Sequence, residues 1–237
     1  MQLFYQNDIT ANATIMLNEE ESRHCSQVLR LKQGDCINIT NGNGSLFLAE
    51  LIEVHHKKCL IAVNNETVYT NPKDFSLHMA VAPTKNMDRM EWFVEKAVEL
   101  GINEITPIIC TRSERKEIKK ERLVKVAISA MKQSLKFHLP QINEAVVFNE
   151  FVSKTKVQNS FICFGEAPES NNLHQFNTAK QHNLFLIGPE GDFTPKEIIT
   201  ASEKNYKPLN LGKSRLRTET AAIHIVSLVS FQQCKVI

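Results

Sequence analysis

The sequence predicts an α/β protein in which a small β-rich domain precedes a larger domain built on a mainly parallel sheet. Up to residue 68, one helical pattern and a series of short apolar runs separated by turn signals predict a β-meander or barrel. From residue 75 onward, strand patterns alternate with helical patterns, which is typical of a parallel sheet covered by helices. The polar stretch YTNPKD at 69–74 separates the two parts, so we expect domains at residues 1–72 and 73–237.

The first helix is expected over residues 18–31, NEEESRHCSQVLRL. Asn18 is a good N-cap residue because its side chain can accept a hydrogen bond from a free N–H group of the first turn. Acidic residues fill that turn, where the helix dipole favours negative charge. The spacing of Cys25, Val28 and Leu29 predicts one apolar helix face.

The remaining elements follow from the same two patterns. In the first domain, strands are expected between residues 36 and 69, with a hairpin turn at Asn-Gly-Asn-Gly, 41–44. In the second domain, we expect strands at 75–83, 104–110, 159–166, 184–191 and 207–212, and helices at 86–101, 119–135, 194–205 and 218–234. The last helix is apolar nearly all round, so both of its sides should be covered, by another domain or by a second copy of the chain.

Two loops at predicted strand ends carry residues suited to ligand binding. The first, Gly-Pro-Glu-Gly-Asp at 188–192, leads into a helix whose predicted start is a capping box, with Thr194 as N-cap and Glu197 three residues later. Its glycines allow close approach of the backbone to a ligand, and the carboxylates of Glu190 and Asp192 suit a cationic or neutral ligand or a diol. The alternative is a tight turn whose acids face water. The second loop places Gly212 at the next strand end, and two adjacent loops of this kind predict a pocket.

The charge distribution and the motifs of the sequence indicate which partners the protein can bind. The 237 residues carry a net charge of +2, with 5 basic against 8 acidic residues up to position 72 and 23 against 18 beyond it. The run TRSERKEIKKERLVK at 111–125 is the most basic, and it predicts either a solvated helix face or a phosphate-contacting surface. The sequence has no metal-ligand motif, no membrane-spanning run and no signal peptide at its start, so we expect no metal, no membrane association and a cytoplasmic location.

Several separated motifs resemble one known family. LIGPEGDF and LGKSRLRTETA are similar to the cofactor loops of the SPOUT superfamily of knotted methyltransferases, in particular the bacterial small-subunit (16S) ribosomal RNA uridine N3-methyltransferases. HCSQVLRLKQGD resembles the family's amino-terminal H-x-x-x-V-L-R motif, and KNMDRMEWFVEKAVELGI resembles its K-x-x-R-x-E-W signature. The motifs occur in the family's order along nearly the whole chain.

The resemblance implies a fold, a cofactor and partners. It implies a PUA-like, RNA-binding β-barrel at residues 1–72 and a SPOUT domain at 73–237 whose carboxyl-terminal loops form a trefoil knot. It also implies S-adenosylmethionine (SAM) as methyl donor, a homodimer, and small-subunit ribosomal RNA, within an assembled subunit, as substrate. The cofactor-binding role carries over to Gly188, Pro189, Glu190, Gly191, Leu211, Gly212, Leu216, Arg217 and Thr220.

The resemblance and the chemistry together give candidate catalytic and RNA-binding residues. Methylation at uridine N3 removes an imide proton, so a positioned cation should favour the developing anion. We expect Arg217 in that role and Glu190 or Glu99 as proton acceptor. The expected RNA contacts are Arg30, Arg89, Arg112, Lys119 and Lys120. For each arginine, the alternative is a surface or interface ion pair.

The chain departs from the family's usual pattern at three places. Asp192 replaces the last glycine of G-P-E-G-G, Ser214, Arg215 and Leu216 stand where arginine, isoleucine and leucine are usual, and Lys132 replaces a glutamate. Neither chemistry nor resemblance explains Asp192. Two other functions compete: a non-catalytic RNA-binding or ribosome-assembly protein of the same fold, and a nucleotide-dependent Rossmann-like enzyme, which the absence of G-x-G-x-x-G disfavours.

Overall fold

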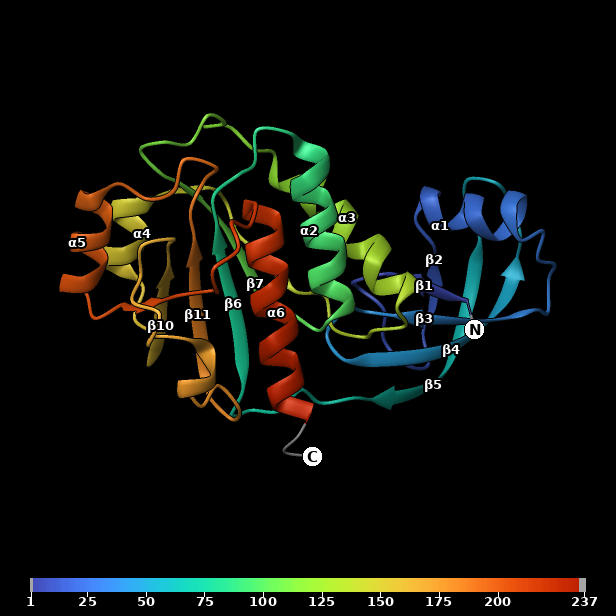
Figure 1. The fold of residues 1–237 in the computed structure, drawn as a ribbon. Helices are drawn as coiled ribbons and strands as arrows, with labels where there is room; N and C mark the ends of the chain where they lie inside the picture. Colours follow the sequence, from blue (N-terminus) through green and yellow to red (C-terminus); the bar gives the residue numbers. More distant parts are fainter. Residues whose placement is uncertain (1, 235–237) are drawn as a thin grey trace. The chain divides into compact units, whose positions relative to one another are not determined.

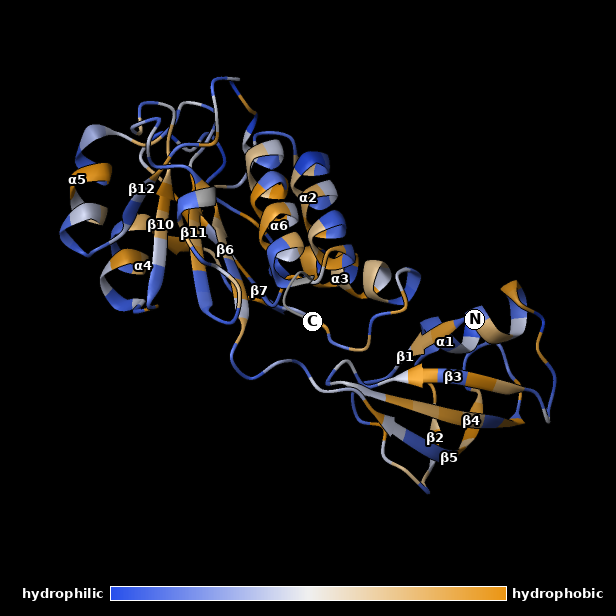
Figure 2. Ribbon diagram, turned by 60° about the horizontal axis from the view of Figure 1, so that its bottom comes forward, coloured by the Kyte–Doolittle hydropathy of each residue, from blue (hydrophilic) through white to orange (hydrophobic). Residues whose placement is uncertain are grey.

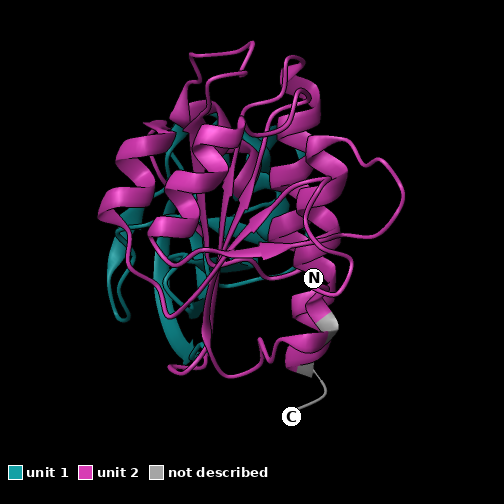
Figure 3. Ribbon diagram, turned by 60° about the vertical axis from the view of Figure 1, so that its left-hand side comes forward, with its two compact units in different colours: residues 1–71, 128–139 teal, residues 72–127, 140–237 magenta. Residues whose placement is uncertain are grey.

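The computed structural model describes residues 2–234, apart from the side chains of His174 and Cys234. The chain divides into two compact units, coloured separately in Figure 3: unit 1 comprises residues 1–71 and 128–139, and unit 2 comprises 72–127 and 140–237. This division differs from the predicted continuous second domain, because the segment 128–139 makes its contacts within unit 1.

Unit 1 is built on a five-stranded sheet in the order β1-β3-β4-β5-β2. Strands β1 and β3 are parallel, and the other neighbouring pairs are antiparallel. The elements of this unit are β1 (Leu3–Tyr5), β2 (Thr14–Met16), α1 (Glu19–Arg23), the π-helix η1 (His24–Val28), β3 (Cys36–Thr40), β4 (Ser45–Glu53) and β5 (Leu60–Val68). The predicted turn at 41–44 joins β3 to β4, with positive φ at Gly42 and Gly44 as such turns require.

The segment 128–139 belongs to unit 1 because it is hydrogen-bonded to the turn between β3 and β4. The N–H of Gly44 donates to Phe137 O at 2.8 Å, and the N–H of Leu139 donates to Gly42 O at 2.8 Å. A Cβ atom at Gly44 would lie 2.4 Å from Tyr69 O and 2.6 Å from Nε2 of His138, a residue of the segment. Only glycine therefore allows the turn and the segment to approach so closely.

Lys132, one of the departures from the family pattern, forms a buried ion pair within unit 1. Its Nζ donates to Glu21 Oε1 at 2.6 Å, and the Glu21 side chain is 4% exposed. The same carboxylate oxygen accepts the backbone N–H of Tyr5 at 3.1 Å. A glutamate at position 132 would place a second negative charge beside Glu21, so lysine suits this chain.

The predicted helix at 18–31 is correct at its start and wrong at its end. Asn18 Oδ1 accepts the Glu21 N–H at 2.9 Å, which confirms the N-cap. After Arg23, however, the helix continues as the π-helix η1, whose wider turn rotates the following residues. Val28 and Leu29 are consequently 67% and 37% exposed, and only Cys25 of the predicted face is buried.

Unit 2 contains the predicted parallel sheet, in the order β12-β10-β11-β6-β7-β8, with β9 paired to β7 (Figure 1). Every pairing in it is parallel. Its elements are β6 (Ser76–Val81), α2 (Met87–Glu99), β7 (Glu104–Ile109), α3 (Lys120–Gln133, which ends in unit 1), β8 (Gln141–Ile142), β9 (Val146–Val147), α4 (Phe148–Lys154), β10 (Asn159–Cys163), the 3-10 helix η2 (Leu173–Gln175), β11 (His182–Ile187), α5 (Pro195–Glu203), β12 (Lys207–Leu209) and α6 (Thr218–Cys234). The sequence did not predict β8, β9, α4 or η2.

Helices cover both faces of the unit 2 sheet, whose strands are strongly apolar (Figure 2). Helices α4 and α5 pack together over one face, in a core that includes Phe151, Leu184 and Leu186. Helix α6 packs on α2, β6 and β11. Because side chains alternate along a strand, Met79 and Phe185 point to the face opposite their neighbours Ala80 and Leu186. Because helices cover both faces, a ligand can reach the sheet only at the ends of its strands, where the loops lie.

Acid should destabilise unit 2 through His78, a buried residue of β6. Burial lowers the pKa of His78, although the Glu104 carboxylate, 3.5 Å from Nδ1, opposes the shift. Because the unfolded chain binds the proton more readily, the free energy of unfolding should fall as the pH drops below the ordinary histidine value of about 6.5. This pH dependence is measured by denaturant unfolding of wild type and His78→Asn at several pH values from about 5 to about 8. Equal pH slopes in the two proteins would contradict the prediction.

Candidate functional site

Loops at the carboxyl ends of three neighbouring strands, β10, β11 and β12, surround a cavity of about 410 Å³ in unit 2. Ligand pockets typically have volumes of this order. The lining residues are Cys163, Phe164, Gly165, Ile187, Gly188, Pro189, Glu190, Gly191, Asp192, Asn210, Leu211, Gly212, Lys213, Ser214, Arg215, Leu216, Thr218 and Ala221. The cavity therefore lies at the edge of the sheet where ligands bind in parallel α/β proteins.

Most of the predicted cofactor residues lie on this cavity. Those in its lining are Gly188, Pro189, Glu190, Gly191, Leu211, Gly212 and Leu216, whereas Arg217 and Thr220 are not among the lining residues. The third wall, from Cys163 to Gly165, was missed. The predicted strand at 159–166 carries Gly165 next to its last position, like the glycines at the ends of the other two strands, and this is the signal that could have revealed the third wall.

The 188–193 loop is held by a hydrogen bond from α6 and by the buried ring of Phe193. The Oγ1 of Thr218, in the first turn of α6, donates to Gly188 O at 3.0 Å. A Cβ atom on Gly188 would lie 3.1 Å from the ring of Phe193, which is buried against Phe148. Position 188 therefore has little room for a side chain.

Three further hydrogen bonds, made by the side chains of Arg112 and Glu190, hold the rest of the loop. Arg112 Nη1 donates to Gly191 O at 2.7 Å and to Phe193 O at 3.4 Å. Glu190 Oε1 accepts the backbone N–H of Lys85 at 3.0 Å. Arg112 and Glu190 therefore shape the loop, in addition to the RNA contact predicted for Arg112 and the proton transfer predicted for Glu190.

Glu197 joins the start of α5 to the loop after β7. The predicted capping box is confirmed, since Glu197 Oε2 accepts the N–H and hydroxyl of Thr194, each at 2.8 Å. Glu197 Oε1 accepts the N–H of Thr111 at 2.8 Å and its hydroxyl at 3.1 Å. Burial alone would raise the pKa of Glu197, but these four donors lower it below its usual range. The carboxylate therefore stays ionised and holds Thr111 beside the loop.

Asp192 has a structural explanation that the sequence did not reveal. Its φ is +61°, a left-handed conformation that glycine, asparagine and aspartate tolerate best. Its Oδ2 accepts the N–H of Gly165 at 3.0 Å, and its Oδ1 accepts the N–H of Phe193 at 2.7 Å. Asp192 therefore connects two of the three cavity walls.

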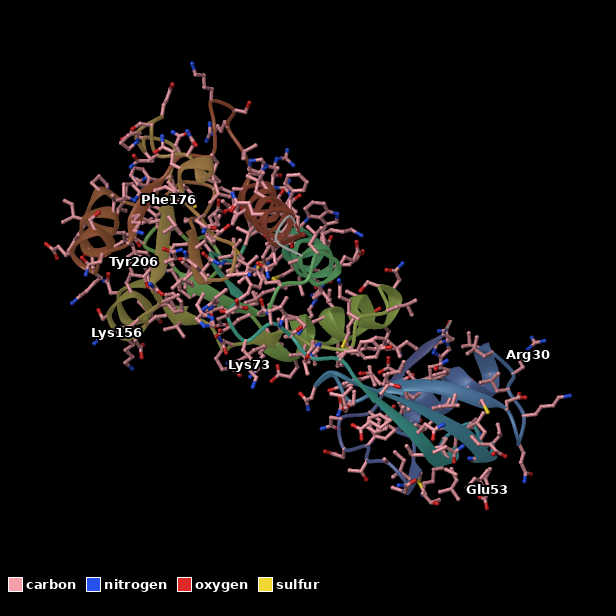
Figure 4. All side chains as sticks on the ribbon, turned by 90° about the horizontal axis from the view of Figure 1, so that it is seen from below. Arg30, Glu53, Lys73, Lys156, Phe176 and Tyr206 are labelled. Atoms are coloured by element: carbon pink, nitrogen blue, oxygen red, sulfur yellow. The ribbon has the colours of Figure 1, made fainter. Side chains whose placement is uncertain are left out.

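The basic residues predicted to contact RNA or to take part in catalysis fall into two groups. Arg89 and Lys120 lie 3.8 Å from the carboxylates of Glu219 and Glu144, respectively, and Arg112 is bound to the loop. Within the part of the chain that the structure describes, Arg30, Lys119 and Arg217 are exposed and have no ion pair or side-chain hydrogen bond. Arg30, labelled in Figure 4, has a φ of +55°, a conformation unusual for arginine.

The basic run at 111–125 is only partly helical. Helix α3 begins at Lys120, and residues 111–119 form the loop after β7, so the predicted solvated helix face applies to the second half alone. Glu99, the other candidate proton acceptor, is paired with Lys96 at 2.8 Å, at the end of α2 farthest from the carboxyl edge of the sheet.

The described residues contain no group of three potential metal ligands. No helix among residues 2–234 is long and apolar enough to cross a membrane.

Two family profiles match the chain. The profile described as an RNA methyltransferase domain matches residues 71–230, and the one described as an RNA methyltransferase PUA domain matches residues 17–64. Among named proteins, the ribosomal RNA small subunit methyltransferase E of Aquifex aeolicus is 30% identical, over 97% of this chain and 99% of its own length. The protein of the same name from Rickettsia conorii is 29% identical over 96% of this chain and 94% of its own.

Solved structures agree with these matches. A probable rRNA methyltransferase from Porphyromonas gingivalis is 36% identical, with a TM-score of 0.91 over 100% of both chains. A ribosomal RNA small subunit methyltransferase E from Neisseria gonorrhoeae, bound to S-adenosyl methionine, is 25% identical, with a TM-score of 0.88 over 98% of both chains.

Proposed function

The chain belongs to the RNA methyltransferase family that includes the ribosomal RNA small subunit methyltransferases E, and from this we propose its reaction. It transfers a methyl group from SAM to N3 of a uridine in small-subunit (16S) ribosomal RNA. The single observation that carries the proposal is the cavity at the carboxyl ends of β10, β11 and β12, in a chain that matches these enzymes over 98% of its length.

The chemistry of the cavity suits SAM. Gly188, Gly191 and Gly212 line the cavity without a side chain, so the backbone can come close to the edges of an adenine ring. The exposed carboxylate of Glu190 suits a ligand that carries a sulfonium charge and a ribose diol, whereas both oxygens of Asp192 accept backbone N–H groups of the loops. When bound, SAM would supply an electrophilic methyl group, and the loops of this chain would hold and orient it.

The proposal includes the knot of the SPOUT fold. A knot forms when the carboxyl-terminal segment passes through the loop between β10 and β11. Two bonds from Asn210 support this path: its N–H donates to Asn171 O at 2.7 Å and its side chain to Ala167 O at 2.6 Å. For unit 1, the match to a PUA domain supports a PUA-like, RNA-binding barrel. Along the chain we propose domains at 1–72 and 73–237, with the segment 128–139 of the second domain packed within unit 1.

Arg217 and Glu190 are the proposed catalytic residues. The imide proton of uridine leaves before or with methyl transfer, and the base then carries negative charge. An exposed guanidinium at Arg217, next to the lining residues Leu216 and Thr218, can stabilise that charge. The exposed carboxylate of Glu190 can accept the proton, since its hydrogen bond from the Lys85 N–H occupies one oxygen only.

We also propose that the enzyme is a cytoplasmic homodimer that acts on an assembled subunit. The apolar sequence of α6 predicts that other parts of the protein, or a second copy of the chain, cover both of its sides. Within unit 2, α2 and the sheet cover one side, and Thr220, His224 and Ser227 on the other side are exposed. A second copy of the chain is the proposed cover. Thr220 and Arg217 would then lie at the subunit interface.

RNA binding should depend on Lys119, whose amine has no partner within residues 2–234. Lys119→Gln should weaken RNA binding and reduce the slope of log K against log salt by about 1, because one phosphate contact is lost. Lys120→Gln should do less, since Glu144 lies 3.8 Å from Lys120 and competes with a phosphate for its charge. Fluorescence titrations at several salt concentrations measure the slope, with Lys156→Gln, at the other end of the sheet, as control. A wild-type slope for Lys119→Gln would exclude this contact.

Calorimetric titration with SAM separates the proposed function from its alternatives. An enzyme of this kind binds SAM saturably. A non-catalytic RNA-binding or ribosome-assembly protein would bind RNA without any heat from SAM, and a Rossmann-like enzyme would bind NAD instead. Small-subunit RNA from a strain that lacks the gene should in addition lack one N3-methyluridine, and persistence of that nucleotide would refute the assignment.

A further inference from the structure

Asp192 lies where two walls of the cavity meet. Strands β10 and β11 are parallel neighbours, with Cys163 opposite Ile187. The loop after β10 contains Gly165, and the loop after β11 contains Asp192. The hydrogen bond of 3.0 Å from the Gly165 N–H to Asp192 Oδ2 therefore joins the two loops directly, and both residues line the cavity.

The backbone at Asp192 is the kind that glycine usually occupies. The N–H of Asp192 donates to Pro189 O at 2.9 Å and closes a tight turn, and the residue has a φ of +61°. A glycine could adopt this turn without strain, but it could not reach Gly165. The carboxylate is thus an addition to a turn that does not itself require it.

Further contacts fix the orientation of this carboxylate. Its second oxygen accepts the Phe193 N–H at 2.7 Å, and Phe193 is buried in the core under the loop. Burial, and secondarily the charge of Asp192, raise the pKa of the Cys163 thiol far above its usual value, so this cavity residue stays protonated. Asp192 therefore acts on the β10 wall through both a hydrogen bond and its charge.

We propose that Asp192 is a positioning residue that sets the width of the SAM cavity by holding the Gly165 loop against the 188–193 loop. The inference rests on the proposed function, because it takes the cavity as the SAM site. Without the carboxylate, the 188–193 loop loses this bond, and the Gly165 N–H, which then has no acceptor among the described residues, holds the start of its own loop less firmly. SAM binding would then have to order that loop, which lowers affinity without changing the reacting groups.

Two substitutions test the proposal without straining the backbone. Asp192→Gly and Asp192→Asn both tolerate the positive φ, whereas alanine would not. We expect Asp192→Gly to raise the Kd for SAM about tenfold and to speed exchange of the Gly165 amide hydrogen about tenfold. The rate at saturating SAM should change less than about threefold. Asp192→Asn keeps one acceptor oxygen and should fall between wild type and Asp192→Gly.

Asn205→Gly is the matched control, because Asn205 has a φ of +66° and lies at the end of α5, away from the cavity lining. It reproduces the entropic effect of a new glycine and should leave both the Kd and Gly165 exchange unchanged. A wild-type Kd or unaltered Gly165 exchange in Asp192→Gly overturns the proposal. If wild type itself fails to bind SAM, the proposed function is wrong, and Gly165 exchange still decides whether Asp192 holds the loop.

Discussion

Replacing Arg217 by glutamine should lower the rate of methyl transfer by about 10²–10³-fold at saturating SAM, the usual effect of removing one donor that stabilises a developing anion. Arg217 is exposed and directly precedes α6, and its guanidinium has no hydrogen-bond or ion-pair partner within residues 2–234. It is not in the cavity lining, so the Kd for SAM should change little. Single-turnover transfer of a labelled methyl group to small-subunit RNA, together with calorimetry, measures both quantities.

Two variants make this prediction specific. Arg217→Lys retains the charge and should recover part of the rate, and more of it at high pH, where the imide loses its proton more easily. Arg215→Gln removes a neighbouring exposed cation that departs from the family pattern, and it should cost far less. Equal losses for Arg215→Gln and Arg217→Gln would mean that the loop supplies only general positive charge.

Gly188→Ala should reduce SAM affinity by about 10-fold to 10²-fold. The new Cβ atom would lie 3.1–3.2 Å from the ring and backbone nitrogen of Phe193, which is buried and cannot retreat. The loop must therefore move, and small displacements of a binding loop have effects of this size. Calorimetry with SAM gives the affinity, and the midpoint of thermal unfolding shows whether the chain still folds.

Gly191→Ala is the matched control for this substitution. Its Cβ atom would come no closer than 3.4 Å to the flexible Arg112 side chain, which is an ordinary contact. We expect less than about a threefold change in SAM affinity, since nothing has to move. If both alanine variants bind SAM like wild type, the 188–193 loop does not shape the site as described.

The sequence predicted those features that depend on local patterns. The capping box of Thr194 and Glu197 occupies only four residues, so its signal is complete in the sequence. The alternation of strands and helices predicted the parallel sheet for the same reason, and the resemblance to methyltransferases predicted the family.

Features that depend on tertiary contacts were not predictable in this way. The π-helix at His24–Val28 exposes Val28 although its spacing is that of a buried residue. Arg112 is separated by 79 positions from Gly191, the residue whose carbonyl it binds, and no periodicity reports such a contact. Asp192 was unexplained for the same reason, since its partner Gly165 belongs to another loop.

Mass mapping of RNA methylated in vitro tests the central claim most directly. Purified protein, labelled SAM and small subunits from a strain that lacks the gene are incubated, and the RNA is digested and mapped. The proposed function predicts label in one N3-methyluridine, and its near absence when Gly188→Ala protein is used at low SAM concentration. SAM binding without transfer, or label on any atom other than uridine N3, would contradict the proposed reaction.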